Sequence, residues 1–241
     1  MIFGRELRKL FPVFAESLAT LHYRSYASDG LITRRNADFL HEPRFSRAYS
    51  VGKSTHSWGL TEPSWRVHTA LWAAAHAAML PGDFVECGVN RGGMALAIME
   101  YLDFNSLTKK FFLLDTFCGF PEHSISSSAN NGQYRDCYED VVRTFAPYRG
   151  AVLIKGVIAD TLDRITSQEI SYLSIDLNCA EPEIAAFRFL WPRLVQGAIV
   201  LLDDYANGPA YQRQKEAFDH LSRELNFPIL TLPTGQGMIV K

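Results

Sequence analysis

The sequence predicts an α/β fold, a doubly wound and mainly parallel sheet of seven strands. Short apolar runs alternate with helical stretches from residue 61 to the C-terminus. These runs are continuously apolar, as in strands that are covered by helices on both faces. The 241 residues, 47% of them hydrophobic, suffice for one sizeable core. We therefore expect a single domain, 1–241, with an N-terminal helix and lid over 1–60 and the sheet core over 61–241.

The first sixty residues predict a helix followed by an irregular segment. Residues 1–22 mix apolar with charged side chains, which is typical of an amphipathic helix, here with a kink at Pro12. We expect this helix to pack on the core or to form a homodimer contact rather than to anchor in a membrane. Residues 23–60 are rich in Ser, Arg, Asn, Gly and His with little periodicity. They are interpreted as an irregular segment or lid.

The elements that follow alternate in type. A helix over 61–80 has Thr61 or Ser64 as its candidate N-cap and ends at the Pro-Gly pair that follows. Residues 234–237 are expected to form the hairpin turn between the last two strands. The expected strands are 84–87, 111–114, 152–154, 172–175, 198–202, 228–232 and 238–240. The expected later helices are 94–102, 134–145, 161–165, 182–194 and 211–225.

The amino-acid composition limits which classes of partner the protein is expected to bind. Lys and Arg total 24 against 26 for Asp and Glu, a formal charge of -2, so the basic excess that nucleic-acid binding needs is missing. The four cysteines are widely spaced without a C-x-x-C pair, which argues against a zinc site or a disulfide scaffold. No apolar run approaches the roughly 18 residues of a membrane span. We expect a cytoplasmic protein that binds neither nucleic acid nor membrane.

Acidic residues stand where four of the predicted strands end. The first strand runs into Glu86, the second into Asp115, the fourth into Asp176 and the fifth into Asp203 and Asp204. Ligands of such sheets bind beyond the carboxyl ends of the strands. A helix cap would explain any one of these acids, but it does not explain all of them together. The sequence therefore predicts a binding site at this edge.

A glycine-rich loop, ECGVNRGG, begins at Glu86. Gly88, Gly92 and Gly93 allow close approach of backbone to a ligand, just before a helix whose N-terminal amides face it. The spacing differs from the G-x-G-x-x-G of a dinucleotide site. Glu86 would repel phosphate but suits an ammonium group, and Asp115 suits the hydroxyls of a ribose. An amino-acid end and a sugar end together describe S-adenosylmethionine.

The candidate cofactor residues come from the loops after three strands. Val157 and Ile158, just past the third strand, are expected to pack on the adenine, with plain core packing as the alternative. The full set is Glu86, Gly88, Asn90, Arg91, Gly92, Gly93, Asp115, Thr116, Val157 and Ile158.

Four motifs follow one another along the chain: FVECGVNRGG from residue 84, LDTFCGFP from 114, DTL from 160 and LDDY from 202. In this order they resemble the macrocin O-methyltransferase (TylF/MycF) family of class I S-adenosylmethionine-dependent methyltransferases. The resemblance covers roughly residues 83–205. It implies a Rossmann-like fold and transfer of a methyl group to a hydroxyl. The first sixty residues match nothing in it.

Three aspartates predict a magnesium site. Asp176, Asp203 and Asp204 lie at the ends of two strands expected to be neighbours, and ligation by oxygen alone suits Mg²⁺. The resemblance implies that they hold Mg²⁺, which orients an acceptor hydroxyl and lowers its pKa. A helix cap with a structural acid is the alternative for the last two. Where the family has Asp-Gly-Asp, this chain has Asp176-Leu177-Asn178, and a neutral Asn178 cannot be the general base that the resemblance implies.

The leading hypothesis is an O-methyltransferase that acts on a hydroxyl of a sugar, polyol or other small-molecule natural product. Asp176, Asn178 and Asp204 are its candidate catalytic positions. His123, in the loop after the second strand, is a candidate base, with simple solvation as the alternative. One rival is a cofactor-binding module with lost or altered catalysis, suggested by Asn178. Another is a nucleotide-sugar enzyme on the same fold, against which Glu86 argues.

Other polar side chains near the expected mouth are weaker candidates. Trp65, Arg66 and His68 begin the helix before the first strand, where they would contact the cofactor carboxylate or the substrate; ordinary helix packing is the alternative. Lys53 and Arg91 would recognise an anionic substrate, with surface solvation as the alternative.

Overall fold

The computed structural model describes residues 12–120 and 134–241, so the expectations on residues 1–11 and on His123 lie outside the described residues. In this part of the chain a sheet of seven strands has the order β5-β4-β3-β6-β7-β9-β8. Strands β3 to β7 are parallel, and β9 is antiparallel to β7 and β8. The doubly wound, mainly parallel sheet is confirmed. Its strands are β3 Asp83–Cys87, β4 Phe111–Asp115, β5 Ala151–Lys155, β6 Ile170–Ile175, β7 Leu194–Leu202, β8 Leu230–Thr231 and β9 Gly237–Val240.

The strand order reverses between β3 and β6. The chain moves outward from β3 through β4 to β5, and then returns to β6 on the other side of β3. Cys87 pairs with Ile175, which pairs in turn with Leu202. The residues around and just beyond these three positions therefore share one edge of the sheet. A crevice at this point is where such sheets bind ligands.

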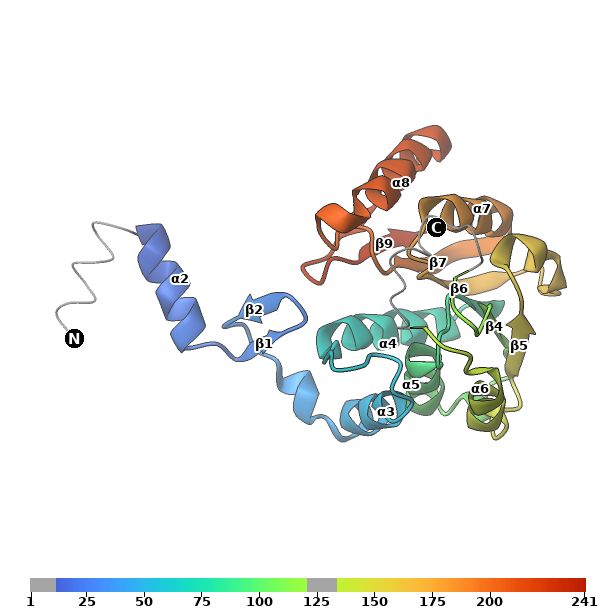
Figure 1. Cartoon of the computed structure of the whole chain (residues 1–241), viewed down its shortest axis with the longest axis horizontal. Coiled ribbons are helices and arrows are strands. Elements are labelled where there is room, and N and C mark those ends of the chain that lie inside the picture. The colour runs from blue at the N-terminus through green and yellow to red at the C-terminus, as the bar shows by residue number, and fades with distance from the viewer. Residues whose placement is uncertain (1–11, 121–133) are drawn as a thin grey trace.

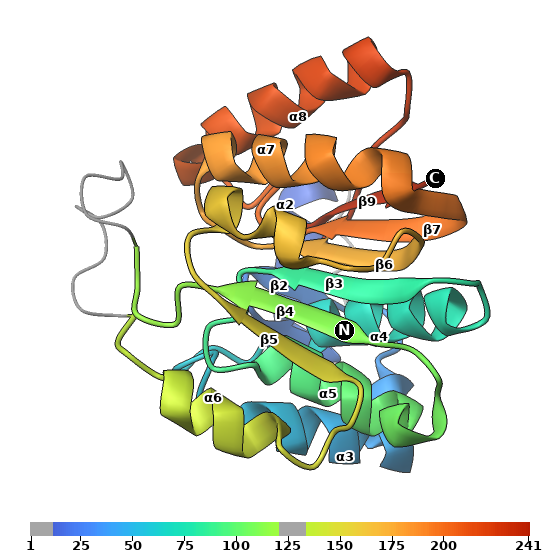
Figure 2. The same cartoon turned by 90° about the vertical axis from the view of Figure 1, so that its right-hand side faces the viewer.

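Helices cover both faces of the sheet, so that the molecule has three layers (Figure 2). One outer layer holds α7 Ala180–Leu190 and α8 Gln212–Leu225. The opposite layer holds α3 Pro43–Lys53, α4 Ser64–Ala78, α5 Gly93–Leu102 and α6 Tyr138–Phe145. Short 3₁₀ turns connect several elements, at Asp38–His41, Phe104–Ser106, Ile158–Asp160, Leu162–Arg164, Trp191–Arg193 and Pro209–Tyr211. The expected side-chain cap of α4 is wrong, because Pro63 is its N-cap and no side chain caps it.

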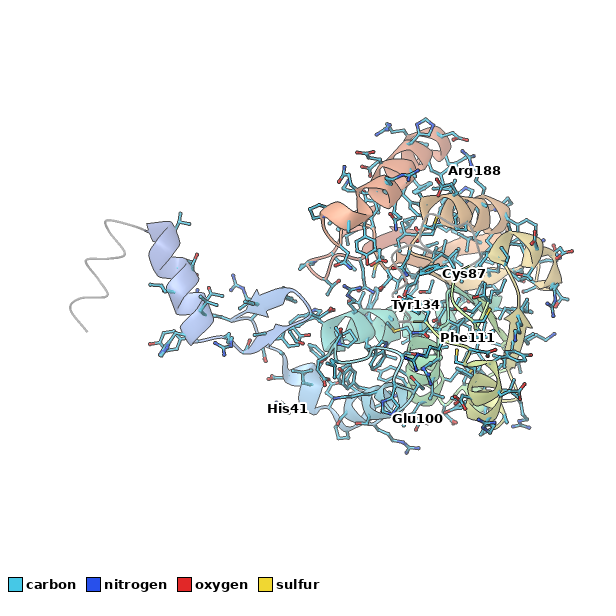
Figure 3. All side chains as sticks on the ribbon, viewed as in Figure 1. His41, Cys87, Glu100, Phe111, Tyr134 and Arg188 are labelled. Carbon is cyan, nitrogen blue, oxygen red and sulfur yellow. The ribbon has the colours of Figure 1, made fainter. Side chains whose placement is uncertain are left out.

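The core lies on both faces of the central strands. Phe84 of β3 packs with Phe111 and Tyr172 in one cluster, and Val85 packs in the cluster beneath α7 and α8. Successive side chains of a strand point to opposite faces, and both faces are buried. This is why the strands read as continuous apolar runs. Figure 3 shows Phe111 within the layers and Arg188 on the outer side of α7.

The N-terminal part corrects the expectation of an irregular segment over 23–60. β1 Tyr26–Ser28 and β2 Leu31–Thr33 form an antiparallel hairpin, and α3 follows after a 3₁₀ turn. The hairpin turn is Asp29-Gly30, with φ of 49° and 73°, as a two-residue turn requires. Strands of three residues are too short to show a period, although the Asp-Gly pair was a usable signal.

The helix α2 Pro12–His22 lies apart from the sheet, on the far side of the hairpin (Figure 1). It bears out the helical part of the N-terminal expectation, while a homodimer contact through it stays a prediction. No helix among the described residues is long and apolar enough to cross a membrane.

Candidate active site

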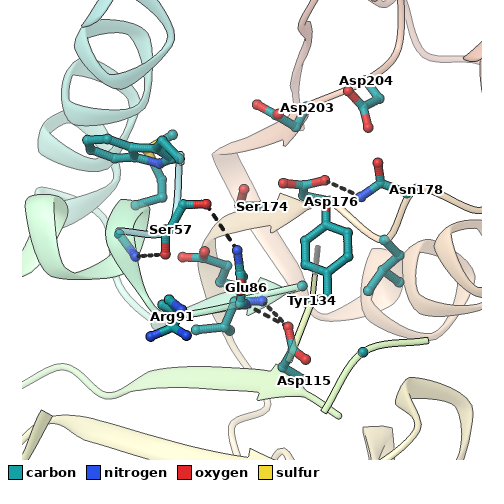
Figure 4. Close-up of a pocket in the computed structure, with 18 of the residues that line it drawn as sticks. Ser57, Glu86, Arg91, Asp115, Tyr134, Ser174, Asp176, Asn178, Asp203 and Asp204 are labelled. Atoms are coloured by element: carbon teal, nitrogen blue, oxygen red, sulfur yellow. Dashed lines mark hydrogen bonds between the residues drawn. The ribbon is translucent and has the colours of Figure 1, made fainter. Parts of the chain in front are cut away.

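A cavity of about 1360 Å³ opens at the carboxyl edge of β3, β4, β6 and β7. Pockets for one small ligand usually measure roughly 300–1,000 Å³, so this cavity has room for two reactants. Nearly all of the predicted residues line it: Glu86, Gly88, Asn90, Arg91, Gly93, Asp115, Thr116, Val157, Ile158, Asp176, Asn178, Asp203 and Asp204. Figure 4 shows acidic side chains from both sides of the strand reversal around it. The structure thus brings these predicted residues together around one cavity.

Gly92 has a different role from the predicted one. Its φ is 86°, and a Cβ on it would collide with the ring of Phe145 in α6. Gly92 therefore allows α6 to pack against the loop rather than a ligand to approach it. At Gly88, with φ 94°, a Cβ would collide with the backbone oxygen of Asp176. Close packing thus requires glycine at both positions, against α6 at Gly92 and against the loop after β6 at Gly88.

Asp115 organises the glycine-rich loop. Its Oδ2 accepts hydrogen bonds from the backbone N–H groups of Val89 and Asn90, each at 2.7 Å, and its Oδ1 accepts one from Phe117 at 2.6 Å. Asn90 has a φ of 51°, a left-handed conformation that is uncommon outside glycine. The carboxylate thus fixes the shape of the loop. Its expected contact with a ribose stays a prediction.

Glu86 is a buried acidic residue that lines the cavity. It is 3% exposed, and its Oε2 lacks a hydrogen-bond partner among the described residues. Burial raises its pKa well above the ordinary value, and the charges of Asp115 and Asp203 raise it further. A buried carboxylate without a cation is costly. Glu86 is therefore arranged to receive a cationic or hydrogen-bond-donating group of a ligand.

A cluster of carboxyl groups lies at the ends of β6 and β7. Asn178 Nδ2 donates a hydrogen bond to Asp176 Oδ1 at 3.2 Å. Burial raises the pKa of Asp176 well above its usual range, with further contributions from Asp203 and Asp204. Burial, then Asp203, raises the pKa of Asp204 to about 7. The cluster therefore holds carboxyl groups that can take up a proton near neutral pH.

Arg66 of α4 supplies the positive charge of this cluster. Its guanidinium donates to Asp203 Oδ2 at 2.8 Å and lies 2.8 Å from a carboxylate oxygen of Asp29 in the hairpin turn. It is also 4.0 Å from Asp204. The other oxygen of Asp203 accepts a hydrogen bond from Gln236 Nε2 at 2.9 Å. Arg66 was a weak candidate in the sequence, whereas Asp29 and Gln236 were missed.

The geometry does not fit the predicted magnesium site. Both carboxylate oxygens of Asp203 are engaged, by Arg66 and by Gln236. Within 12–120 and 134–241, no three His, Cys, Asp or Glu side chains are placed so that they could hold a metal ion. Arg66 pairs with Asp203, one of the three aspartates that were predicted to hold the metal.

Several other candidates have structural partners. Trp65 and His68 both pack on Phe39, with ring centroids 5.0 and 3.9 Å away, so helix packing was the correct alternative. Lys53 pairs with Glu62 rather than facing the cavity. Arg91 does line the cavity, and its guanidinium lies 3.7 Å from Asp140.

A second wall of the cavity comes largely from the segment that was expected to be an irregular segment or lid, although its individual residues were not predicted. Asp29 and Gly30 of the hairpin turn contribute to it, as do residues 56–61 between α3 and α4. Tyr134 lies between Asp176 and Asp115 in Figure 4. Their positions depend on long-range packing, and only the Asp-Gly turn had a local signal.

The comparison with known families decides the classification. The family model described as macrocin-O-methyltransferase (TylF) matches residues 66–233. The chain belongs to this family. The family resemblance of the four sequence motifs is thereby confirmed, and Asp29, Gly30 and residues 56–61 of the second wall precede the matched region.

Two relatives and a solved structure give the range of similarity. A tetracenomycin-C rhamnosyl 4'-O-methyltransferase of Streptomyces olivaceus is 30% identical over 142 residues, which are 53% of this chain and 54% of the relative. The mycinamicin III 3''-O-methyltransferase of Micromonospora griseorubida is 27% identical over 145 residues, 52% of this chain and 56% of the relative. The chain thus spans about half the length of these relatives. The O-methyltransferase NovP is similar in fold, with a TM-score of 0.63, 22% identity and coverage of 73% and 79% of the two chains.

Proposed function

We propose that this protein is an S-adenosylmethionine-dependent O-methyltransferase. The observation that carries the proposal is Glu86, a buried carboxylate that lines the cavity with an unpaired oxygen. The ammonium group of the cofactor's amino-acid end supplies the missing partner. The glycine-rich loop, Asp115 and the family membership support the same cofactor. The size of the cavity supports a second reactant beside it.

Residues after β3, β4 and β5 would hold the cofactor. Glu86 would hold its amino-acid end, Asp115 its ribose, and Val157 and Ile158 its adenine, and all of them line one cavity. Val157 is 39% exposed and Ile158 only 5%, so Val157 offers more surface to a ring. The carboxyl groups after β6 and β7 line another part of the same cavity.

The acceptor hydroxyl binds at Asp176 and Asp204. Its oxygen attacks the methyl carbon as the carbon–sulfur bond breaks, giving a methyl ether and S-adenosylhomocysteine. The hydroxyl proton passes to one of the two carboxylates, because Asn178 has no basic group. Asp203 is engaged by Arg66 and Gln236. One relative is named for a rhamnosyl compound, and we propose a sugar, a polyol or a related natural product as the acceptor.

Calorimetry with S-adenosylhomocysteine tests the cofactor, with and without MgCl₂. We expect micromolar binding that MgCl₂ does not change, and absence of binding would overturn the proposal. Asp176→Asn should retain this binding but lose turnover across a panel of hydroxyl acceptors, because a proton acceptor at the methyl is removed. Asp163→Asn, an exposed carboxyl outside the cavity, is the matched control and should retain both.

A second candidate function is a cofactor-binding module without turnover. The hydrogen bond from Asn178 to Asp176 favours it, because it occupies an oxygen of a candidate base. This function predicts cofactor binding with no methyl transfer to any acceptor of the panel. It also predicts no gain of turnover in Asn178→Asp, whereas any turnover by the wild-type protein excludes it.

A further inference from the structure

The segment between α3 and α4 contacts the cofactor loop directly. Ser57 Oγ accepts a hydrogen bond from the backbone N–H of Gly93 at 2.9 Å, at the first turn of α5. The backbone oxygen of Ser57 accepts a second one from Asn90 Nδ2 at 3.1 Å. Both appear as dashed lines in Figure 4. One residue therefore holds two positions of the loop, and it lies outside the region matched by the family model.

Close packing of α3 on α5 fixes this contact. A Cβ on Gly52 would lie 2.5 Å from the backbone oxygen of Gly93, and a Cβ on Gly93 would lie 2.8 Å from Ser57 Cβ. At these distances, a residue with a side chain fits at neither glycine position. The end of α3 and the start of α5 thus meet at backbone distance, and Ser57 has little freedom to move away from the loop.

Hydrogen bonds hold Asn90 from two sides. Its backbone lies in the left-handed region, with φ 51°, which asparagine adopts more readily than most residues other than glycine. Asp115 holds its N–H from one side, and Ser57 holds its side chain from the other. The loop is thereby shaped from both sides before any ligand binds, which lowers the ordering cost of binding.

We propose that Ser57 is a cofactor-positioning residue, which fixes Asn90 and Gly93 so that the loop presents a preformed surface to S-adenosylmethionine. Ser57 itself lines the cavity. The inference rests on the proposed function, because it takes the cavity as the cofactor site. It extends that site to a part of the chain that precedes the family match.

The test compares Ser57→Ala with the wild-type protein. Losing one hydrogen bond should raise the Kd for S-adenosylhomocysteine about five- to tenfold. It should raise the KM for S-adenosylmethionine similarly, with kcat at saturating cofactor nearly unchanged. Hydrogen exchange at the Gly93 amide in the ligand-free protein should accelerate. Ser54→Ala is the control, because Ser54 lies on the same segment, is exposed and donates its hydroxyl to Val51 O rather than contacting the loop.

The possible outcomes distinguish failure of the positioning role of Ser57 from failure of the proposed function. Wild-type binding together with unchanged affinity in Ser57→Ala overturns the positioning role alone. A wild-type protein that does not bind S-adenosylhomocysteine overturns the proposed function and this inference with it. A third outcome is that Ser57→Ala lowers kcat and Tm and weakens cofactor and acceptor binding equally. This would indicate general structural damage and would also overturn the positioning role.

Discussion

Glu86 contributes both a charge and a shape to the cavity, and a substitution can separate these two contributions. Glu86→Gln removes the charge and retains the shape, so the cofactor's ammonium loses a charge-assisted hydrogen bond worth about 1.5–3 kcal/mol. We expect the affinity for S-adenosylhomocysteine to fall roughly 10- to 100-fold in calorimetry. The Tm of the ligand-free protein should not fall, because the lost carboxylate had an unpaired oxygen. Asp163→Asn serves as the control for affinity, and wild-type affinity in Glu86→Gln would disprove the ammonium assignment.

For single residues, the sequence predicted which acidic side chains lie near one another. It did not predict which hydrogen-bond and ion-pair partners they have. The acids at the strand ends meet because the carboxyl ends of parallel strands share one edge of the sheet. By contrast, Arg66 and Gln236 reach Asp203 from α4 and from the turn before β9. These partners lie 137 and 33 residues away from Asp203 in the sequence. Hydrophobic periodicity does not encode contacts between residues so far apart.

Arg66 connects three elements, since it comes from α4 and pairs with Asp29 of the hairpin and Asp203 after β7. The three side chains are only 12%, 13% and 18% exposed. Arg66→Met would leave two largely buried carboxylates without a cation, so we expect the free energy of unfolding to fall by about 3 kcal/mol. Urea denaturation measures this change.

The control is Arg188→Met, which breaks an exposed pair with Glu224 on the outer helices. Exposed ion pairs contribute little to stability, so this variant should unfold nearly as the wild-type protein does. Equal destabilisation by the two substitutions would show that burial of the Arg66 pairs does not matter.

Element boundaries were predictable where local chemistry sets them. The helix expected over 182–194 ends at Leu190, because a 3₁₀ turn that contains Pro192 follows at Trp191–Arg193 and Leu194 already belongs to β7. The central strands β3, β4 and β6 were found because they are buried on both faces. The hairpin strands are only three residues long, and α3 was missed although Phe45, Ala48 and Gly52 recur at helical spacing on its buried face.

For the whole molecule, the strand reversal concentrates several carboxyl groups at one edge. Burial raises the pKa of Glu86, Asp176, Glu183 and Asp204 above their ordinary values. The fold class, read from the sequence, implied this gathering of acids. It did not imply Glu183, which lies inside α7 and accepts a hydrogen bond from the Leu177 N–H at 3.3 Å.

These raised pKa values predict how stability depends on pH. Burial raises the pKa of Glu183 to about 8 and that of Asp204 to about 7. Above about pH 4.5 the unfolded chain has lost these protons while the native state keeps them. Stability is therefore fullest below that pH and is lost as the pH rises to about 8, so the Tm of the ligand-free protein should fall from about pH 5 to 8.

Glu183→Gln isolates one part of this slope, because an amide does not titrate. Its Tm should fall less steeply with pH than that of the wild-type protein, and its advantage should be largest at about pH 8. Glu181→Gln is the matched control in the same helical turn, since the pKa of Glu181 is lowered by its hydrogen bond with Cys179. That variant should keep the wild-type slope. If Glu183→Gln also keeps the wild-type dependence of Tm on pH, then Glu183 is ionised in the native state. The carboxyl groups at this edge would then tolerate more negative charge than their burial implies.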